Sequence, residues 1–258
     1  MFAKERLDDR FARLAAPRRF GRPEDVLVVG IYRDGEIIGR AVEELRRSHH
    51  RVTVRLGAMG DPVGPLADVT ALSHLSRGKF QNVNDLLTGQ EGHDWLLVID
   101  DDVELPAGFL DVFIEVCRTY DFALAQPAQT RYSNANWPVT KRRSLSVART
   151  TRFVEIGPVT GVRADAMQRL LPFPEALRYG WGLDFHWAHV MQTHGLRMGV
   201  VDVVAVKHVS RQVASTYSWD AAQEEGRAYL RSVPHLPTSV AARPLRVHRR
   251  PLSRRRPD

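Results

Sequence analysis

The chain has 258 residues, of which 43% are hydrophobic and 26% charged, and its net charge is +7. This composition suits one soluble α/β domain that is long enough to bury a substantial core. It excludes membrane-spanning helices, because no apolar run approaches the roughly 18–20 residues that a span needs. The single cysteine, Cys117, excludes an intramolecular disulfide and argues against a thiolate zinc site, so we expect a buried structural thiol.

The positive charge is concentrated at one end of the sequence. Residues 243–258 hold seven arginines and one aspartate, which is six of the seven net charges. We therefore expect no nucleic-acid-binding groove on the folded elements. The prolines in this segment predict a disordered tail, either solvated or touching an anionic membrane or an acidic partner. Residues 1–24 are charged and lack an apolar signal core, which predicts a cytoplasmic protein whose tail can reach the inner membrane face.

Apolar patterning predicts alternating strands and helices in the first half of the chain. Residues 26–31 form a continuous apolar run, which is typical of a strand buried on both faces. Further strands are expected at 51–57, 95–100 and 122–126, and helices at 36–48, 79–89 and 106–119, the last opened by Pro106. This order predicts a mostly parallel, doubly wound, Rossmann-like sheet with helices on both faces.

The second half departs from that order. A polar, turn-rich excursion is expected over 130–150, followed by short strands at 152–156 and 158–163, helices at 164–171 and 184–194, and a last strand at 197–206. The expected organisation is a charged helical arm over 1–24, one domain over 25–220, a helical segment over 221–242 and the tail over 243–258. Because ligands bind beyond the carboxyl ends of strands in such sheets, functional residues should follow positions 31, 57, 100 and 206.

Three aspartates, Asp100, Asp101 and Asp102, follow the apolar strand WLLVI directly. Adjacent anions repel each other unless a cation offsets them, and carboxylate oxygens suit Mg²⁺ or Mn²⁺. Side chains alternate along an extended segment, so Asp100 and Asp102 can point to the same side. We expect Asp102 to bind the cation directly and Asp100 to bind it through water, or to bind the ribose. Asp101 should turn away from the cation and is kept as a donor contact; the alternative for the triplet is an acidic turn.

This triplet resembles the DxD region of family-2 glycosyltransferases, which have the GT-A fold. The segment GKFQNVN, from Gly78 to Asn84, resembles the segment that precedes the DxD strand in many of these enzymes. The resemblance runs from about residue 26 to residue 208. It implies that Lys79 contacts the donor diphosphate and that Asn84 faces the donor site; the alternative for Lys79 is a solvated charge at a helix start.

The loop YGWG brackets Trp181 between two glycines, which lets the backbone turn tightly and expose the indole to a sugar ring or an apolar acceptor. Asp184 then opens a helix. The resemblance implies that Asp184 is the catalytic base, and a helix N-terminus would keep its carboxylate ionised. The sequence has Leu183-Asp184 where the family often has Glu-Asp, so the base rests on one carboxylate. The alternative role for Asp184 is that of a helix cap.

The same resemblance implies further site residues. His208, after the last strand, is implied as an additional metal ligand, which would favour Mn²⁺ over Mg²⁺; the alternative is an ordinary surface or core histidine. The remaining implied donor contacts are Tyr32, Asp61, Thr160, Gly161 and Arg211, and the acceptor contacts are Trp181, Gly182 and His186.

Together these residues predict a metal-dependent glycosyltransferase. It would move a sugar from a nucleotide-diphosphate sugar, expected to be a UDP-sugar, to an acceptor hydroxyl with inversion. One alternative is a sugar-phosphate nucleotidyltransferase, although GIYRDGE has too few glycines for the phosphate loop of that class. Another is a non-catalytic protein of the same fold that binds nucleotide sugar or carbohydrate. A third is a nucleic-acid-binding protein that acts through the arginine tail.

Overall fold

The computed structural model describes residues 2–133, 135, 137–209, 218–241, 243–250 and 252. The described strands are β1 (Asp25–Tyr32), β2 (Arg51–Ala58), β3 (Thr70–Leu72), β4 (Trp95–Asp100), β5 (Val103–Glu104), β6 (Phe122–Gln129), β7 (Ala148–Thr151), β8 (Val159–Arg163), β9 (Arg197–His208) and β10 (Arg246–His248). The helices are α1 (Phe2–Ala15), α2 (Gly35–Arg46), α3 (Lys79–Leu87), α4 (Phe109–Tyr120), α5 (Ala164–Leu170), α6 (Leu183–Thr193), α7 (Trp219–Ser232) and α8 (Thr238–Ala241), with short 3-10 turns η1 (Gly64–Val69) and η2 (Pro138–Thr140).

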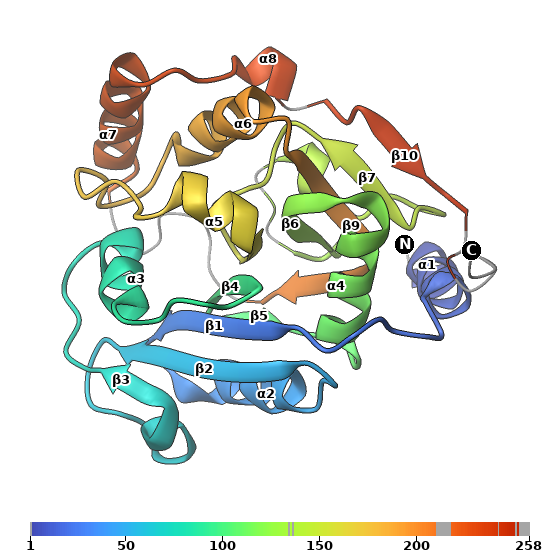
Figure 1. Cartoon of the computed structure of the whole chain (residues 1–258), viewed down its shortest axis with the longest axis horizontal. Coiled ribbons are helices and arrows are strands. Elements are labelled where there is room, and N and C mark those ends of the chain that lie inside the picture. Colours follow the sequence, from blue (N-terminus) through green and yellow to red (C-terminus); the bar gives the residue numbers. More distant parts are fainter. Residues whose placement is uncertain are drawn as a thin grey trace.

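One sheet runs through the molecule in the order β10-β7-β9-β6-β8-β4-β1-β2-β3 (Figure 1). The strands β2, β1 and β4 are parallel neighbours, and β6 is parallel to β9. Strand β8 lies antiparallel between β4 and β6, so β6 and β9 run in the same direction as β1. The carboxyl ends of β1, β2, β4, β6 and β9 therefore share one edge of the sheet. The predicted α/β fold class, with a largely parallel central sheet and helices on both faces, is confirmed.

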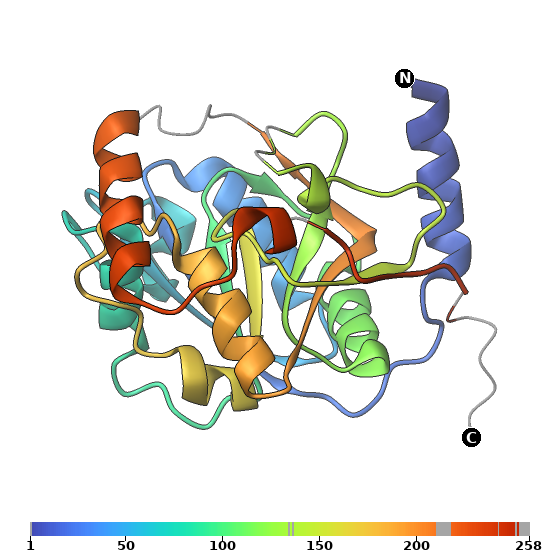
Figure 2. The ribbon, with the colours of Figure 1, turned by 90° about the horizontal axis from the view of Figure 1, so that it is seen from above.

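Strand β1 shows why helices cover both faces. Val26 and Val28 pack into one core with α2 and α4, whereas Leu27 and Val29 pack into another with α3, α5 and α6. Successive side chains of a strand point to opposite faces, so a run of apolar residues needs a cover on each side. Figures 1 and 2 place α1 and α7 at opposite ends of the molecule.

Helix α4 begins later than its proline predicted. The helix starts at Phe109, because Gly108 adopts a left-handed conformation with φ +69° and leaves Pro106 in the preceding turn. The polar excursion also holds more structure than expected. It contributes β7, where Arg149 forms a buried ion pair with Asp202 at 2.9 Å.

The expectation of a disordered tail is wrong for Arg246–His248. These residues form β10, which pairs antiparallel with β7, and the His248 ring stacks on Tyr120 with centroids 4.1 Å apart. An edge strand offers unpaired backbone groups that a following segment can satisfy, and tail composition does not reveal such a partner. Contact of the tail with an anionic membrane stays a prediction. In the part of the chain that the structure describes, no helix has the length and apolar character needed to cross a membrane.

The N-terminal arm is helical, as expected, and it is docked on the domain. Asp9 of α1 accepts a hydrogen bond from Arg142 at 2.6 Å, and the buried Asp8 accepts one from Ser144 at 3.1 Å. Helix α1 also lies against β9. The charged residues of the arm therefore meet complementary groups of the excursion between β6 and β7.

A glycine in β9 gives a test of the packing. A Cβ atom at Gly199 would lie 2.3 Å from the ring of Phe122, whereas a Cβ at Gly39 in α2 would meet nothing within 4 Å. We expect Gly199→Ala to lower the free energy of unfolding by about 1–3 kcal/mol through overpacking. Gly39→Ala, its control, should raise it by about 0.5–1 kcal/mol because alanine favours helix. Urea unfolding measures both, and equal effects would contradict this packing.

Candidate functional site

Three side chains converge at the carboxyl edge of the sheet. Asp100, Asp102 and His208 each offer a ligand atom, and these atoms lie within 4.8 Å of one another. The two-stranded pairing of β5 with β9 sets Val103 opposite His208, which brings the imidazole to the aspartate turn. His208 Nε2 lies 3.0 Å from Asp102 Oδ1. The residues that the sequence singled out as metal ligands are thus brought together.

The turn after β4 separates the three aspartates. Asp100 and Asp102 face the cluster, whereas Asp101 Oδ2 accepts a hydrogen bond from the backbone N–H of Arg33 at 2.9 Å. The N–H of Asp100 donates to Pro158 O at 2.9 Å, which ties the turn to the loop before β8. Asp100 and Asp102 therefore share a side as expected, although a turn rather than an extended segment places them there, and Asp101 fixes the connection between β1 and α2.

Lys79 lies beside the cluster at the first position of α3. Its Nζ is 2.6 Å from Asp100 Oδ1 and donates to Ile156 O at 2.9 Å. A cation at this distance offsets part of the repulsion between the aspartates. The segment that begins at Gly78 thus places its lysine beside the triplet, and contact of Lys79 with a donor diphosphate stays a prediction.

The three converging groups suit a divalent cation. Two carboxylates and one imidazole combine hard oxygen ligands with a nitrogen ligand that Mn²⁺ accepts. The 3.0 Å between His208 Nε2 and Asp102 Oδ1 is close to the spacing of neighbouring ligands around an octahedral ion with bonds of about 2.1 Å. Asp102 is only 6% exposed, so its charge is poorly compensated by water.

Asp184 lies in the first turn of α6 and is buried. Its Oδ1 accepts the N–H of Phe185 at 3.0 Å. Burial, and next the nearby carboxylate of Glu155, raise the pKa of Asp184 to about 7. Desolvation thus outweighs the backbone hydrogen bonds at the helix N-terminus, and the carboxylate ionises less readily than the sequence alone suggested.

Glu155 is a site residue that the sequence reasoning missed. It lies between β7 and β8, and it is buried and electrostatically coupled to Asp100, Lys79 and His208. Desolvation raises its pKa to about 7, opposed by a hydrogen bond from Thr140 and by the nearby cationic groups. The only signal was one carboxylate inside the apolar run RFVEIGPV.

Two glutamines of β6 hold Glu155 in place. Gln129 Nε2 donates to Glu155 Oε2 at 2.9 Å, and Gln126 Oε1 accepts the N–H of Glu155 at 2.5 Å. Both glutamines are buried. Thr160, an implied donor contact, donates to Glu155 O at 3.3 Å. The hydrogen bonds from β6 thus fix a second buried carboxylate near enough to Asp184 to influence its pKa.

The fold of this chain is similar to the folds of several solved structures. No family model and no curated protein matches the sequence. The structure is similar to GalNAc-T7 bound to UDP, GalNAc and Mn²⁺, with a TM-score of 0.59 and 10% identity over 81% of this chain and 48% of that one. It is also similar to the mannosyltransferase PcManGT of Pyrobaculum calidifontis in complex with GDP-Man and Mn²⁺, with a TM-score of 0.57 and 15% identity over 93% of this chain and 75% of that one.

The chain has the GT-A fold. A further similar structure is S. aureus TarS 1-349 in complex with UDP-GlcNAc, with a TM-score of 0.55, 15% identity, and coverage of 79% of this chain and 65% of that one. The chain spans about half the length of GalNAc-T7. At these sequence identities, the similarity to solved structures establishes the fold alone.

Two of the residues implied as donor contacts use their side chains for hydrogen bonds within the protein. The Tyr32 side chain is 1% exposed, and its hydroxyl bonds Thr70 Oγ1 at 2.7 Å, so it fills the core between β1 and β3. Asn84 donates to Phe173 O at 2.8 Å and accepts the N–H of Phe173 at 2.9 Å. Its amide therefore ties α3 to a loop, and a role of Asn84 at the donor site stays a prediction. Short motifs do not distinguish such structural hydrogen bonds from ligand contacts.

Three other residues were implied as donor contacts, and they differ in where they lie in the fold. Asp61 lies beyond the carboxyl end of β2, as expected, with its exposed carboxylate 3.2 Å from His74 Nε2. Gly161 lies inside β8, where a Cβ atom would be 2.6 Å from the Phe113 ring, so its lack of a side chain serves packing. Arg211 lies outside the described residues.

The implied acceptor residues lie beside α7. Trp181 is half-buried, and its indole meets that of Trp219 edge to face with ring centroids 4.7 Å apart. Gly182 has φ +90° and precedes α6. His186 Nδ1 lies 2.8 Å from Pro234 O, so its imidazole is turned toward the segment after α7. Acceptor contact by these three residues stays a prediction.

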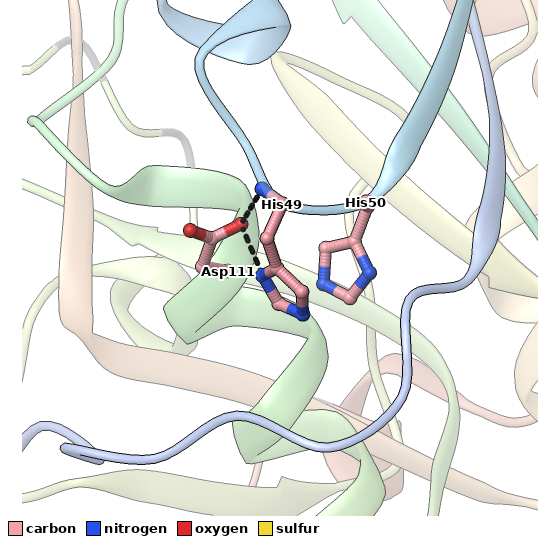
Figure 3. A group of neighbouring side chains, drawn as sticks. All are labelled: His49, His50 and Asp111. Carbon is pink, nitrogen blue, oxygen red and sulfur yellow. Dashed lines mark hydrogen bonds and ion pairs between the residues drawn. The ribbon is translucent and has the colours of Figure 1, made fainter.

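A second group of potential ligands lies at the opposite edge of the sheet, where His49 and His50 precede β2 and approach Asp111 of α4 (Figure 3). His49 Nδ1 is 3.0 Å from Asp111 Oδ1. The N–H of Glu24 donates to His50 Nδ1 at 3.0 Å, so the hydrogen of His50 sits on Nε2 and that atom has no lone pair for a metal. Burial lowers the pKa of His50 to about 4 and keeps it neutral. This arrangement indicates a hydrogen-bonded group that supports the fold rather than a metal site.

Proposed function

We propose that the protein is a metal-dependent glycosyltransferase that moves a sugar from a nucleotide-diphosphate sugar to an acceptor hydroxyl. The carrying observation is the convergence of Asp100, Asp102 and His208, with Lys79 beside them, at the carboxyl edge of a GT-A sheet. This edge is where ligands bind in open α/β sheets. Similar structures hold UDP or GDP-Man together with Mn²⁺, which supports the same ligand class here.

Asp102 and His208 would hold the cation directly, and Asp100 would hold it directly or through water. The cation, Mn²⁺ or Mg²⁺, supplies positive charge to the leaving diphosphate. Lys79 adds a second positive charge from the start of α3. Its present contact with Asp100 would be exchanged for a phosphate oxygen when donor binds, because both acceptors are anionic and the ammonium has three donors.

Asp184 would take the proton of the acceptor hydroxyl as that oxygen attacks the anomeric carbon from the face opposite the diphosphate, which inverts the configuration. A pKa of about 7 suits a general base at neutral pH, since the group is then partly ionised and still basic. Glu155 supports this basicity by placing negative charge nearby. The sheet holds these groups in fixed positions, which removes part of the entropic barrier to a two-substrate reaction.

A thermal-shift experiment tests the ligand class. We expect UDP-sugars with Mn²⁺ to raise the melting temperature by roughly 5–10 °C at a hundredfold excess over Kd, which corresponds to about 2.7 kcal/mol. UDP-sugar with EDTA should shift it much less, and GDP-Man with Mn²⁺ tests the choice of base. Equal shifts with Mn²⁺ and with EDTA would contradict a cation-bridged donor.

Product analysis separates the alternatives. Release of UDP with formation of a new glycosidic bond supports the transferase. Release of inorganic diphosphate from UTP and a sugar phosphate would instead support a nucleotidyltransferase. Binding of UDP-sugar without consumption, over hours and with mixed acceptors, would support a non-catalytic binding protein. Deletion of residues 253–258, which keeps β10 and the buried Leu252, should leave donor hydrolysis intact if the arginines at 254–256 have no catalytic part.

A further inference from the structure

Helix α7 is fastened to the loop that carries Trp181. Glu225 accepts the backbone N–H groups of Arg178 and Tyr179 at 2.8 Å and that of Gly180 at 3.3 Å. One carboxylate therefore satisfies three consecutive amides, which is a strong way to fix a loop. Gly226 lets the helix approach, because a Cβ atom there would be 2.9 Å from Trp181 Cβ.

The same loop packs against two residues that neighbour Lys79. A Cβ atom at Gly180 would be 2.7 Å from the ring of Phe80 and 3.5 Å from Ile156 Cδ1. Phe80 follows Lys79 in α3, and Ile156 O accepts a hydrogen bond from Lys79. Helix α7 is thus connected through a single loop to Phe80 and Ile156, the two neighbours of Lys79.

An indole is exposed at the start of α7. Trp219, the first residue of α7, is 46% exposed although it meets Trp181 edge to face at 87°. Its neighbours along the helix are polar: Asp220, Gln223, Glu224, Arg227 and Arg231 line a shallow hollow on α7. Gln223 lies one turn after Trp219, so the hollow begins beside the indole. An apolar ring next to amide, carboxylate and guanidinium groups is therefore presented to solvent.

We propose that Trp219 and Trp181 form an acceptor subsite for a saccharide, with a pyranose ring stacked on the Trp219 indole and its hydroxyls bonded by the polar face of α7. This subsite rests on the proposed transferase. A pyranose has an apolar face of C–H groups and a rim of hydroxyls, which matches a flat π-face bordered by hydrogen-bonding groups. The hollow is lined by two carboxylates and two guanidinium groups, so it has no excess of positive charge to attract an anionic membrane.

Ligand-observed saturation-transfer NMR tests this subsite with lactose, cellobiose, maltose and N,N′-diacetylchitobiose as probes. We expect at least one disaccharide to receive saturation on the C–H face of a ring, and Trp219→Ala to reduce its binding at least tenfold. Trp219→Phe should retain part of the binding, because it keeps an aromatic face. The control is Phe20→Ala, which removes a 40% exposed aromatic side chain beside His49 and should leave binding unchanged.

Steady-state kinetics of the variants provide a second test of the subsite. Trp219→Ala should raise KM for the saccharide acceptor about tenfold and leave KM for the donor and donor hydrolysis by water unchanged. Glu225→Ala, which frees the loop, should raise the same acceptor KM. The subsite is overturned if no probe disaccharide binds the wild-type protein, if Trp219→Ala binds as the wild type does, or if Trp219 instead governs binding to phosphatidylglycerol vesicles. Saccharide binding through Trp219 in a protein that consumes no nucleotide sugar would refute the transferase and leave the subsite standing.

Discussion

Asp102→Asn is expected to abolish Mn²⁺-dependent turnover of nucleotide sugar, with a loss of at least about a hundredfold in kcat/KM. The substitution keeps the size and shape of a side chain that is only 6% exposed, so the fold should persist. It removes the negative charge that faces His208 at 3.0 Å and with it a direct ligand of the cation. Turnover at several Mn²⁺ concentrations, together with Mn²⁺ binding by electron paramagnetic resonance, measures the effect.

Asp101→Asn is the matched control for that experiment. Its carboxylate accepts the N–H of Arg33 and points away from the cluster, and an asparagine oxygen can still accept this bond. We expect a change of less than about fivefold, because the lost hydrogen-bond strength is of the order of 1 kcal/mol. Full activity of Asp102→Asn, or activity of the wild type that persists in EDTA, would refute the metal-dependent mechanism.

The metal-binding half of the candidate site could be predicted from the sequence because it depends on regular structure. A short apolar run such as WLLVI is typical of a strand buried on both faces, and aspartates after such a strand are expected at the carboxyl edge of a parallel sheet. His208 follows another apolar strand, and parallel strands bring their carboxyl ends together. Those two facts place Asp100, Asp102 and His208 at one edge of the sheet, and the pairing of β5 with β9 then brings His208 to the aspartates.

The rest depends on contacts that local patterns do not encode. Glu155 lies between two short strands, and its importance comes from Gln126, Gln129 and Asp184, which are distant in sequence. Tyr32 follows a strand in the expected place, but its side chain turns inward to Thr70. Position along the chain therefore predicts which backbone reaches the site, whereas the direction of a side chain depends on tertiary packing.

Asp184→Asn is expected to abolish transfer and also to make the protein more stable at alkaline pH. The folded pKa of about 7 lies above the ordinary value of 3.8, so the folded state binds this proton more tightly than the unfolded chain does. Below pH 4 both states are protonated and the group has no effect on stability. As the pH rises from 4 to 7 the unfolded chain ionises freely, so the wild type loses stability, and the loss is complete above pH 7.

A rise of about three pKa units corresponds to roughly 4 kcal/mol, and asparagine avoids that cost because it carries no charge. We therefore expect the variant to exceed the wild type in free energy of unfolding by roughly 2–4 kcal/mol at pH 8 and by much less at pH 5, measured by urea unfolding. Transfer should fall by about a hundredfold or more. In the wild type, kcat/KM should rise with pH through about 7 and then level off.

Asp165→Asn is a control that should change the free energy of unfolding in the opposite direction. Hydrogen bonds from Arg163 hold the pKa of Asp165 below its ordinary value, so its ionised form stabilises the folded state at neutral pH and this stabilisation is lost as the pH falls. Its replacement should lower stability at pH 8 and leave transfer unchanged. A base must be buried enough to stay basic, and the fold bears the cost of that burial. If Asp184→Asn were active, or were destabilised at pH 8 as Asp165→Asn is, Asp184 would be a structural residue of α6 and the base would have to be sought elsewhere.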